Sequence, residues 1–298
     1  FDLNEGEILG IVGESGSGKS VTAHATMRLI PANGRITRGA IRFRDTNVLA
    51  MDPEELRAFR GRSVSMIFQE PGGSVDPIYS IGKSLSETLR VQHPEYSEED
   101  IFRESVRLLE EVHITQPASR LKNFPHQFSG GLLQRIMIAH ALAGEPDVLI
   151  ADEPTTALDV TIQAGIIDLL LELRRSRGLA IIFITHNLAL ISGFADRIVV
   201  MYGGAVMEDG PVNDVLQHPQ HPYTRALIGS LVPFGAHHSD TELTVMPGTP
   251  PDPLHPEPGC PFVPRCPLAG DRCTDALPTV RSAGEVRFRC IVTGTETE

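Results

Sequence analysis

The sequence predicts an α/β fold with a mainly parallel sheet, and three observations lead to this prediction. Short apolar runs of strand type recur along the chain, and helical patterns lie between them. Several of these runs are almost continuously apolar, as expected for strands that are buried on both faces of a parallel sheet. Residues 13–20, GESGSGKS, follow the first run directly and fit the pattern G-x-x-x-x-G-K-S, whose backbone N–H groups surround phosphate oxygens.

The patterns also place the individual elements. We expect strands at 7–13, 63–69, 147–153, 179–186 and 196–204, and helices at 19–30, 97–114, 130–143 and 161–177. Alternation of these elements gives an α/β core with a phosphate loop. Residues 71–127 interrupt the alternation, and after residue 215 proline becomes frequent, which indicates a small, loop-rich lobe without a large apolar core. Four histidines of this lobe are expected to be solvated: His218, His221, His237 and His238.

Length and charge narrow the class of protein. With 298 residues and a net charge of −12, the chain is acidic and has room for two domains, or for one large domain with an appendage. Proteins that bind the phosphates of nucleic acids depend on clustered Lys and Arg. The negative net charge of this chain therefore argues against a nonspecific nucleic-acid binder. No apolar run approaches the roughly 20 residues that cross a bilayer, and no signal peptide is visible. A protein of this kind that serves a membrane would dock on other subunits from the cytoplasm.

The phosphate loop carries the first set of candidate ligands. Its three glycines let the backbone turn with N–H groups directed inward, and the following helix adds its positive end. Lys19 is expected to reach the β- and γ-phosphates, and Ser20 to bind Mg²⁺ through its hydroxyl. The full set is Gly13, Glu14, Ser15, Gly16, Ser17, Gly18, Lys19 and Ser20. A chance glycine-rich turn is the alternative, and the strand before the loop and the helix after it argue against that alternative.

A second group of candidates follows the apolar run DVLIAD. Asp152 ends this run, where the carboxyl edge of a parallel sheet meets its ligand, and would hold the Mg²⁺ shell through water. Glu153 is then placed to orient the attacking water as a general base. Capping of the next helix is the alternative role for these carboxylates. Ser129, Gly130 and Gly131 also precede a helix, so their N–H groups can bind phosphate.

The phosphate loop and the tract 128–159 together resemble the ATP-binding subunit of an ABC transporter, because the tract joins FSGG, a strand ending in DEP, and TTALD. This resemblance implies a P-loop NTPase (RecA-like) core of ABC type with an inserted helical subdomain and a Cys-containing C-terminal extension. It places the core at 1–70 and 144–215, the helical signature subdomain at 71–143 and the extension at 216–298. Such proteins have further strands and an adenine-stacking aromatic before the loop, so we expect the chain to lack its N-terminal strands.

The resemblance also assigns catalytic and metal-binding roles at two strand ends. Gln69 would bind Mg²⁺ or its water and lead into the loop that touches the membrane subunits. His186 would contact the γ-phosphate. The alternative for each of these side chains is a structural role as a polar residue at the end of a strand.

In the ABC family that this chain resembles, the Ser-Gly-Gly turn of one subunit binds the nucleotide of another. By resemblance, Ser129, Gly130 and Gly131 complete the ATP site of a second subunit, and Asp159 lies at the seam between the two chains. The resemblance therefore implies that ATP is held between two ATPase subunits. Phe128 and Leu132 stand where the common LSGGQ wording has Leu and Gln, a variation typical of the peptide-importer branch.

All four cysteines lie in the last 39 residues: Cys260, Cys266, Cys273 and Cys290. A cytosolic location disfavours disulfides and favours metal ligation. Four irregularly spaced thiolates could hold a [4Fe–4S] cluster or tetrahedral Zn²⁺, and four reduced thiols packed in a small lobe are the alternative.

The extension resembles that of the oligopeptide/dipeptide/nickel importer branch of ABC ATPases, through HPYTRAL (221–227), GTPPDP (248–253) and GCPFVPRCPLA (259–269). The resemblance implies a peripheral subunit on the cytoplasmic face of the membrane that hydrolyses ATP with Mg²⁺ to energise import of di- or oligopeptides. Its implied partners are two permeases, a second ATPase (a copy or a paralogue) and, through the permeases, an extracytoplasmic binding protein, with no nucleic acid. The cargo stays open between dipeptide, oligopeptide, nickel and another solute. The alternative function is a soluble ABC-type ATPase acting on nucleic acid or ribosomes.

Overall fold

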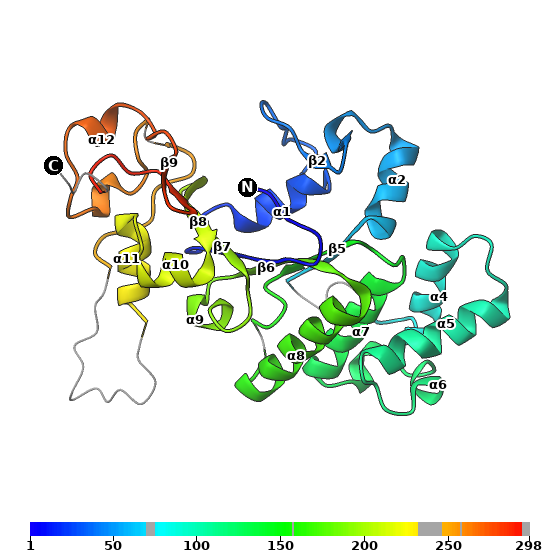
Figure 1. Cartoon of the computed structure of the whole chain (residues 1–298). Coiled ribbons are helices and arrows are strands. Elements are labelled where there is room, and N and C mark those ends of the chain that lie inside the picture. The colour runs from blue at the N-terminus through cyan, green and yellow to red at the C-terminus, as the bar shows by residue number, and fades with distance from the viewer. Residues whose placement is uncertain (70–74, 157, 232–245, 257, 294–298) are drawn as a thin grey trace. The chain divides into compact units, whose positions relative to one another are not determined.

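The computed structural model describes residues 1–69, 75–156, 158–231, 246–256 and 258–293. The chain forms two compact units (Figure 1). The first contains residues 1–3, 7–20 and 184–298, and the second contains residues 4–6 and 21–183. In the described part of the chain, no helix combines the length and the apolar character that crossing a membrane requires.

The first unit is built on a mixed sheet. Its strands lie in the order β1 (Ile8–Val12), β7 (Arg197–Tyr202), β8 (Ala205–Pro211), β10 (Val286–Phe288) and β9 (Arg281–Ala283). The first pair is parallel, and the three that follow are antiparallel. All five residues of β1 are buried, as its unbroken apolar run predicts. The last two strands belong to the C-terminal extension, which therefore adds to the sheet.

The helices of the first unit are short. They are α9 (Leu188–Ile191), α10 (Val212–Gln217), α11 (Pro222–Gly229), the 3-10 helix η3 (Val263–Arg265) and α12 (Arg272–Asp275). Between these helices and the sheet lies an aromatic cluster of Tyr202, Tyr223 and Phe262, all fully buried. Their ring centroids are 4.4–5.4 Å apart, within the range of favourable aromatic pairs. The extension is thus held by large apolar side chains, where the sequence predicted a lobe without a substantial core.

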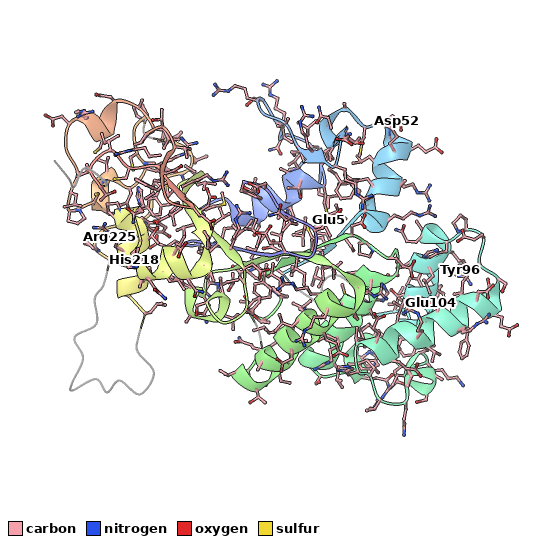
Figure 2. The ribbon with its side chains drawn as sticks, viewed as in Figure 1. Glu5, Asp52, Tyr96, Glu104, His218 and Arg225 are labelled. Atoms are coloured by element: carbon pink, nitrogen blue, oxygen red, sulfur yellow. The ribbon has the colours of Figure 1, made fainter. Side chains whose placement is uncertain are left out.

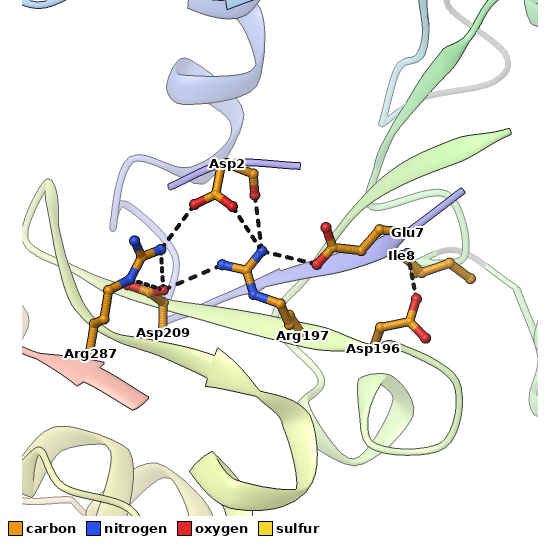
Figure 3. Close-up of polar contacts among 7 residues, drawn as sticks. All are labelled: Asp2, Glu7, Ile8, Asp196, Arg197, Asp209 and Arg287. Atoms are coloured by element: carbon orange, nitrogen blue, oxygen red, sulfur yellow. Dashed lines mark hydrogen bonds and ion pairs between the residues drawn. The ribbon is translucent and has the colours of Figure 1, made fainter. Parts of the chain in front are cut away.

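Ion pairs link three neighbouring strands of this sheet, β7, β8 and β10 (Figure 3). Arg197 of β7 pairs with Asp2 at 3.3 Å, with Glu7 at 3.0 Å and with Asp209 of β8 at 3.6 Å. Arg287 of β10 pairs with the same Asp209 at 2.7 Å. Asp209 therefore joins two strands through two guanidinium groups, although the partial exposure of Arg287 limits what its pair contributes to stability.

The second unit contains the remaining strands. β4 (Val64–Ile67) pairs with β5 (Val148–Asp152) in parallel, with Met66 opposite Ile150, and β6 (Ala180–Thr185) lies beside β5 and ends in the first unit. A small hairpin of β2 (Arg42–Phe43) and β3 (Thr46–Asn47) stands apart from this sheet. The strand predictions at 63–69, 147–153 and 179–186 are confirmed within two residues at each end.

Helices make up most of the second unit. They are α1 (Lys19–Thr26), the 3-10 helix η1 (Val48–Ala50), α2 (Pro53–Arg62), α4 (Ile81–Gln92), α5 (Glu98–Glu111), α6 (Pro117–Arg120), the 3-10 helix η2 (Pro125–Gln127), α7 (Gly130–Leu142) and α8 (Val160–Arg177). The helices α4, α5 and α6 form the insertion that interrupts the alternation, and α5 packs on α7 (Figure 1). Asp52, labelled in Figure 2, precedes α2 and caps it by accepting from the N–H groups of Glu54 and Glu55. Helix α1 stops at Thr26, short of the predicted residue 30, because Arg28 takes a left-handed conformation at φ 53°.

One histidine on α7 gives the fold a pH dependence. His140 Nδ1 lies 3.3 Å from the Thr88 hydroxyl, and its Nε2 atom is buried without a hydrogen-bond partner among the described residues. Burial lowers the pKa of His140 to about 4. The folded state therefore favours the neutral ring.

We expect His140 to destabilise the fold as the pH falls. Its folded pKa lies below the unfolded value of about 6.5, so its contribution to stability is complete above that value and declines as the pH falls towards 4. Between pH 7 and pH 5 this single group would cost about 2 kcal/mol of unfolding free energy. Denaturant titrations at both pH values should show a smaller loss for His140→Gln. The exposed His218→Gln should keep the full loss, and an equal loss in His140→Gln would contradict the account.

Candidate active site

The phosphate loop joins β1 to α1, as predicted. The Lys19 side chain is only 5% exposed, and its Nζ donates to the carbonyls of Gly13 at 2.7 Å and Glu14 at 3.0 Å and contacts the Ser17 hydroxyl at 3.4 Å. The ammonium group thus lies inside the loop. Gly13 has φ 152°, and a Cβ there would come within 2.1 Å of the Met201 carbonyl oxygen. Only glycine fits at the point where the loop leaves the strand.

The β7–β8 turn supports the loop from behind. Gly204 in this turn donates its N–H to the Ser17 carbonyl at 3.1 Å. Ser17 itself is 3% exposed. A hydrogen bond from a neighbouring hairpin therefore holds the middle of the loop.

Glu14, the second residue of the loop, is held by the C-terminal extension. Its backbone N–H donates to the Tyr223 hydroxyl at 3.0 Å. Its carboxylate accepts two hydrogen bonds from the Arg265 guanidinium, at 2.7 and 3.1 Å. The hydrogen bond to Glu14 raises the pKa of Arg265, which stays charged. Tyr202 completes the group, because its hydroxyl accepts from Arg265 at 3.0 Å.

Sequence reasoning missed these contacts. Tyr223 and Arg265 lie in the segments HPYTRAL and GCPFVPRCPLA, which indicate the branch of the family but not what the segments touch. Arg265 is 251 positions from Glu14, and no local pattern links residues that far apart. The signal available was a charged residue within a short apolar segment, which suggests a buried ion pair without naming its partner.

The carboxyl end of β5 presents the predicted acidic pair. Asp152 ends the strand and is 2% exposed. Glu153 follows with φ 47°, a left-handed conformation that is uncommon outside glycine and concentrates at functional sites. Its Oε2 atom accepts from Gln69 Nε2 at 3.1 Å and from the Thr156 hydroxyl at 2.8 Å. The structure therefore brings Gln69 and Glu153 together, and it adds Thr156, which the sequence reasoning did not select.

The Ser-Gly-Gly turn begins α7, as predicted. Ser129 is exposed and caps the helix, its hydroxyl accepting from the Leu132 N–H at 3.4 Å. Gly131 packs against α8, and a Cβ there would lie 2.5 Å from a methyl carbon of Ile162. Asp159 caps α8 by accepting from the Ile162 N–H at 3.0 Å. The turn and Asp159 thus start two helices that are in contact.

His186, the remaining residue predicted to contact the nucleotide, is exposed. His186 follows β6 directly, at the end of a fully buried strand. It belongs with the phosphate loop to the first unit, whereas Gln69, Asp152 and Glu153 belong to the second. That these groups surround one nucleotide stays a prediction.

The four cysteines gather around one pocket of the extension. Cys260, Cys266, Cys273 and Cys290 line it together with His221. Within the described residues, however, no three His, Cys, Asp or Glu side chains are arranged as a metal site. All four thiols are free, and burial raises the pKa of Cys260 to about 11.

The prediction that His221 is solvated is wrong, since this residue is 1% exposed. Its Nδ1 accepts from the Tyr223 N–H at 3.0 Å, and its Nε2 lies 3.9 Å from Cys260 Sγ. Burial lowers the pKa of His221 to about 4. Of the other tail histidines, His218 is exposed as predicted, while His237 and His238 lie outside the described residues.

Comparison with known proteins identifies two regions of the chain. Residues 1–156 match the family described as ABC transporter, and residues 207–273 match the family described as oligopeptide/dipeptide transporter, C-terminal region. The dipeptide transport ATP-binding protein DppD of Bacillus subtilis is 46% identical over 285 residues, which are 95% of this chain and 84% of the relative. The oligopeptide transport ATP-binding protein OppD of Escherichia coli is 48% identical over 278 residues, which are 93% and 81% of the two chains.

Solved structures agree with this assignment. The ATP-binding cassette MJ0796, in a dimeric post-hydrolysis state bound to ADP and Pi, superposes with a TM-score of 0.62 at 26% identity, covering 71% of this chain and 88% of that one. CbiO1 from Clostridium perfringens, part of an ABC transporter complex, gives a TM-score of 0.64 at 25% identity over 73% and 82% of the chains. The chain therefore belongs to the ABC transporter family, as an ATP-binding and ATP-hydrolysing subunit with the C-terminal region of oligopeptide and dipeptide transporters.

Proposed function

We propose that this chain energises an ABC importer of di- or oligopeptides. The observation that carries the proposal is the presence, in one chain, of the phosphate loop and of the C-terminal region matched over residues 207–273. The names of the relatives, which specify dipeptide and oligopeptide transport, support the cargo class. We keep the domain division proposed from the sequence, with the core at 1–70 and 144–215, the helical subdomain at 71–143 and the extension at 216–298.

The phosphate loop would bind the triphosphate. The backbone N–H groups of residues 13–20 and the amino end of α1 supply positive partial charge, and Lys19 adds a full charge. Ser20, Gln69 and Asp152 offer a hydroxyl, an amide and a carboxylate, the hard oxygen donors that Mg²⁺ prefers, so the residues present fit this ion. When bound, Mg²⁺ would neutralise charge that develops on the phosphates.

Glu153 would orient the attacking water and accept its proton. Its carboxylate is held in one position by Gln69 and Thr156, as a general base requires. His186 would contact the γ-phosphate and stabilise the charge that builds up there during transfer. Hydrolysis would thus depend on the Glu153 carboxylate as the base and on donors such as His186 around the γ-phosphate.

The Ser-Gly-Gly turn would serve the ATP of a second subunit. Ser129, Gly130 and Gly131 present the amino end of a helix of 13 residues, where an anion is favoured. Asp159 would lie at the seam between the two ATPase chains. The site would then close only when two subunits, either copies or paralogues, enclose the nucleotide.

We further propose that the subunit works at the cytoplasmic face of the membrane, bound to two permeases that receive substrate from an extracytoplasmic binding protein. The loop after Gln69 would transmit the state of the ATP site to the permeases. This chain would supply energy, and the binding protein and permeases would select the cargo.

For the cysteine pocket, three occupancies stay open: a [4Fe–4S] cluster, Zn²⁺, or four reduced thiols without a metal. The thiols are the soft donors that both metal groups take, but no three metal-binding side chains of the described residues are arranged as a metal site. Ligation requires thiolates, and the raised pKa of Cys260 means that the bound cation would have to drive deprotonation. Iron and zinc contents after anaerobic purification distinguish the cluster, the zinc site and four reduced thiols.

Reconstitution tests the proposed function. Proteoliposomes that contain the permeases and both ATPase subunits, with the binding protein supplied, should accumulate labelled di- or oligopeptides only with ATP. Lys19→Met should remove this uptake, because the loop loses its only full positive charge, while the exposed Lys83→Met should leave it intact. Failure to associate with the permeases, together with retained RNA or DNA, would contradict the proposal.

A further inference from the structure

Arg265 is a buried cation in the C-terminal extension that reaches the phosphate loop. Its side chain is 5% exposed, and η3 presents it from the segment GCPFVPRCPLA. Besides its two hydrogen bonds to Glu14 and one to Tyr202, it donates to the Pro247 carbonyl at 2.8 Å. All of these residues belong to the first unit, so the contacts lie within one compact body.

The charge of Glu14 makes this contact consequential. A carboxylate on the second residue of a phosphate loop would repel the triphosphate, and the repulsion at a given distance is stronger where water is excluded. Arg265 balances this charge through a bidentate pair, the strongest geometry available to a guanidinium and a carboxylate. The Glu14 side chain is 26% exposed and that of Arg265 only 5%, so solvent screens the attraction between the two charges only in part.

Tyr223 fixes the backbone of the same residue. Its hydroxyl accepts the Glu14 N–H, and its ring is fully buried against Tyr202 and Phe262. The hydroxyl therefore has little freedom to move. One loop residue is thus held at its backbone and at its carboxylate by two side chains of the extension.

We propose that Arg265 and Tyr223 are positioning residues for ATP binding, through which the C-terminal extension sets the conformation and the charge of the phosphate loop. The proposal rests on the proposed role of residues 13–20 as the triphosphate site. Neither side chain touches the reacting atoms, so their effect should fall on the KM for ATP and not on kcat.

Substitutions separate the charge of Arg265 from its packing. In the reconstituted importer, Arg265→Met should raise the KM for ATP about tenfold, the effect of losing one charge-assisted contact, with kcat unchanged within about twofold. Glu14→Gln added to Arg265→Met removes the uncompensated charge and should return the KM to within about threefold of the original. A role of Arg265 confined to packing would not be rescued by removing the charge of Glu14.

Two further variants keep the proposal testable if Arg265→Met folds poorly. Tyr223→Phe removes only the hydroxyl that accepts the Glu14 N–H and should raise the KM about fivefold at an unchanged kcat. The control variant Arg287→Met breaks the ion pairs with Asp2 and Asp209 in the same unit. Arg287 forms these pairs away from the phosphate loop, so the KM should stay unchanged. Unchanged KM in both Arg265→Met and Tyr223→Phe, or failure of Glu14→Gln to rescue, would overturn the proposal. If Lys19→Met also kept its KM, the proposed triphosphate site itself would fail.

Discussion

Glu153→Gln is expected to lower ATP turnover by about 10³-fold while ATP still binds within a few-fold of its original affinity. The amide has nearly the shape of the carboxylate but cannot accept a proton from the attacking water. Binding should survive because the proposed contacts to the phosphates come from the loop of residues 13–20 and not from this side chain.

The structure explains why this carboxylate should have so large an effect. Glu153 is held by donors from Gln69 and Thr156, and its backbone is in the left-handed region at φ 47°. Such a conformation costs of order 1–3 kcal/mol and persists where the surroundings enforce it. A strained, doubly hydrogen-bonded carboxylate at the end of a buried strand is suited to act as a base and is a poor choice for a simple helix cap.

Steady-state hydrolysis and equilibrium binding of labelled ATP test this prediction in the reconstituted complex. Glu172→Gln on the exposed face of α8 is the matched control and should leave both quantities unchanged. Thr156→Val should lower turnover by a smaller factor, about tenfold, because it removes a donor that positions Glu153. Undiminished hydrolysis in Glu153→Gln would contradict its assignment as the base.

Ser129→Asp is expected to abolish hydrolysis at the ATP site of the partner subunit. Aspartate is as good a helix cap as serine, so α7 should remain folded. The added negative charge would face the γ-phosphate that the turn is proposed to bind, and turnover there should fall by more than about 10²-fold. Ser129→Asn, which has the shape of the aspartate variant without its charge, should lose less than about tenfold.

A cap elsewhere provides the control for Ser129. Ser80 caps α4 by accepting from the Lys83 N–H at 3.3 Å, and Ser80→Asp should leave turnover unchanged. Single-turnover measurements with labelled ATP report the chemical step directly. Equal losses in Ser129→Asp and Ser129→Asn would mean that the serine shape matters and its proposed phosphate contact does not.

The local sequence pattern predicted five strands, β1, β4, β5, β6 and β7, and four helices, α1, α5, α7 and α8. The buried strands β5 and β6 carry continuous apolar runs with no competing periodicity, so their positions follow from the sequence. The strand β8 was not predicted, because AVMEDGP mixes polar and apolar residues without a strand pattern. It is a strand because it pairs with β7 on one side and β10 on the other. Glu208 and Asp209 are buried in this strand, where they pair with the N–H groups of Gln220 and His221 and with Arg287.

The chemical site was predicted where a motif is contiguous. The phosphate loop and the pair Asp152–Glu153 could be placed at strand ends because their motifs are contiguous along the chain, and their chemical roles stay predictions. The partners of Glu14 could not be predicted from the sequence. Tyr223 is 209 positions away and contacts the loop only because the extension folds onto the sheet. For the same reason the burial of His221 was missed, because the histidine lies among prolines and its burial depends on Tyr223 and Cys260.

We propose that the ATP site of this chain is completed by the Ser-Gly-Gly turn of a second ATPase subunit. Sedimentation of the Glu153→Gln chain with the second ATPase of its transporter, with and without ATP, tests this most directly. We predict that ATP converts separate subunits into a two-chain complex, and that Ser129→Asp prevents the complex while this chain still binds ATP. Subunits that stay separate with ATP bound, and hydrolyse it at a rate per chain independent of concentration when Glu153 is restored, would contradict the claim.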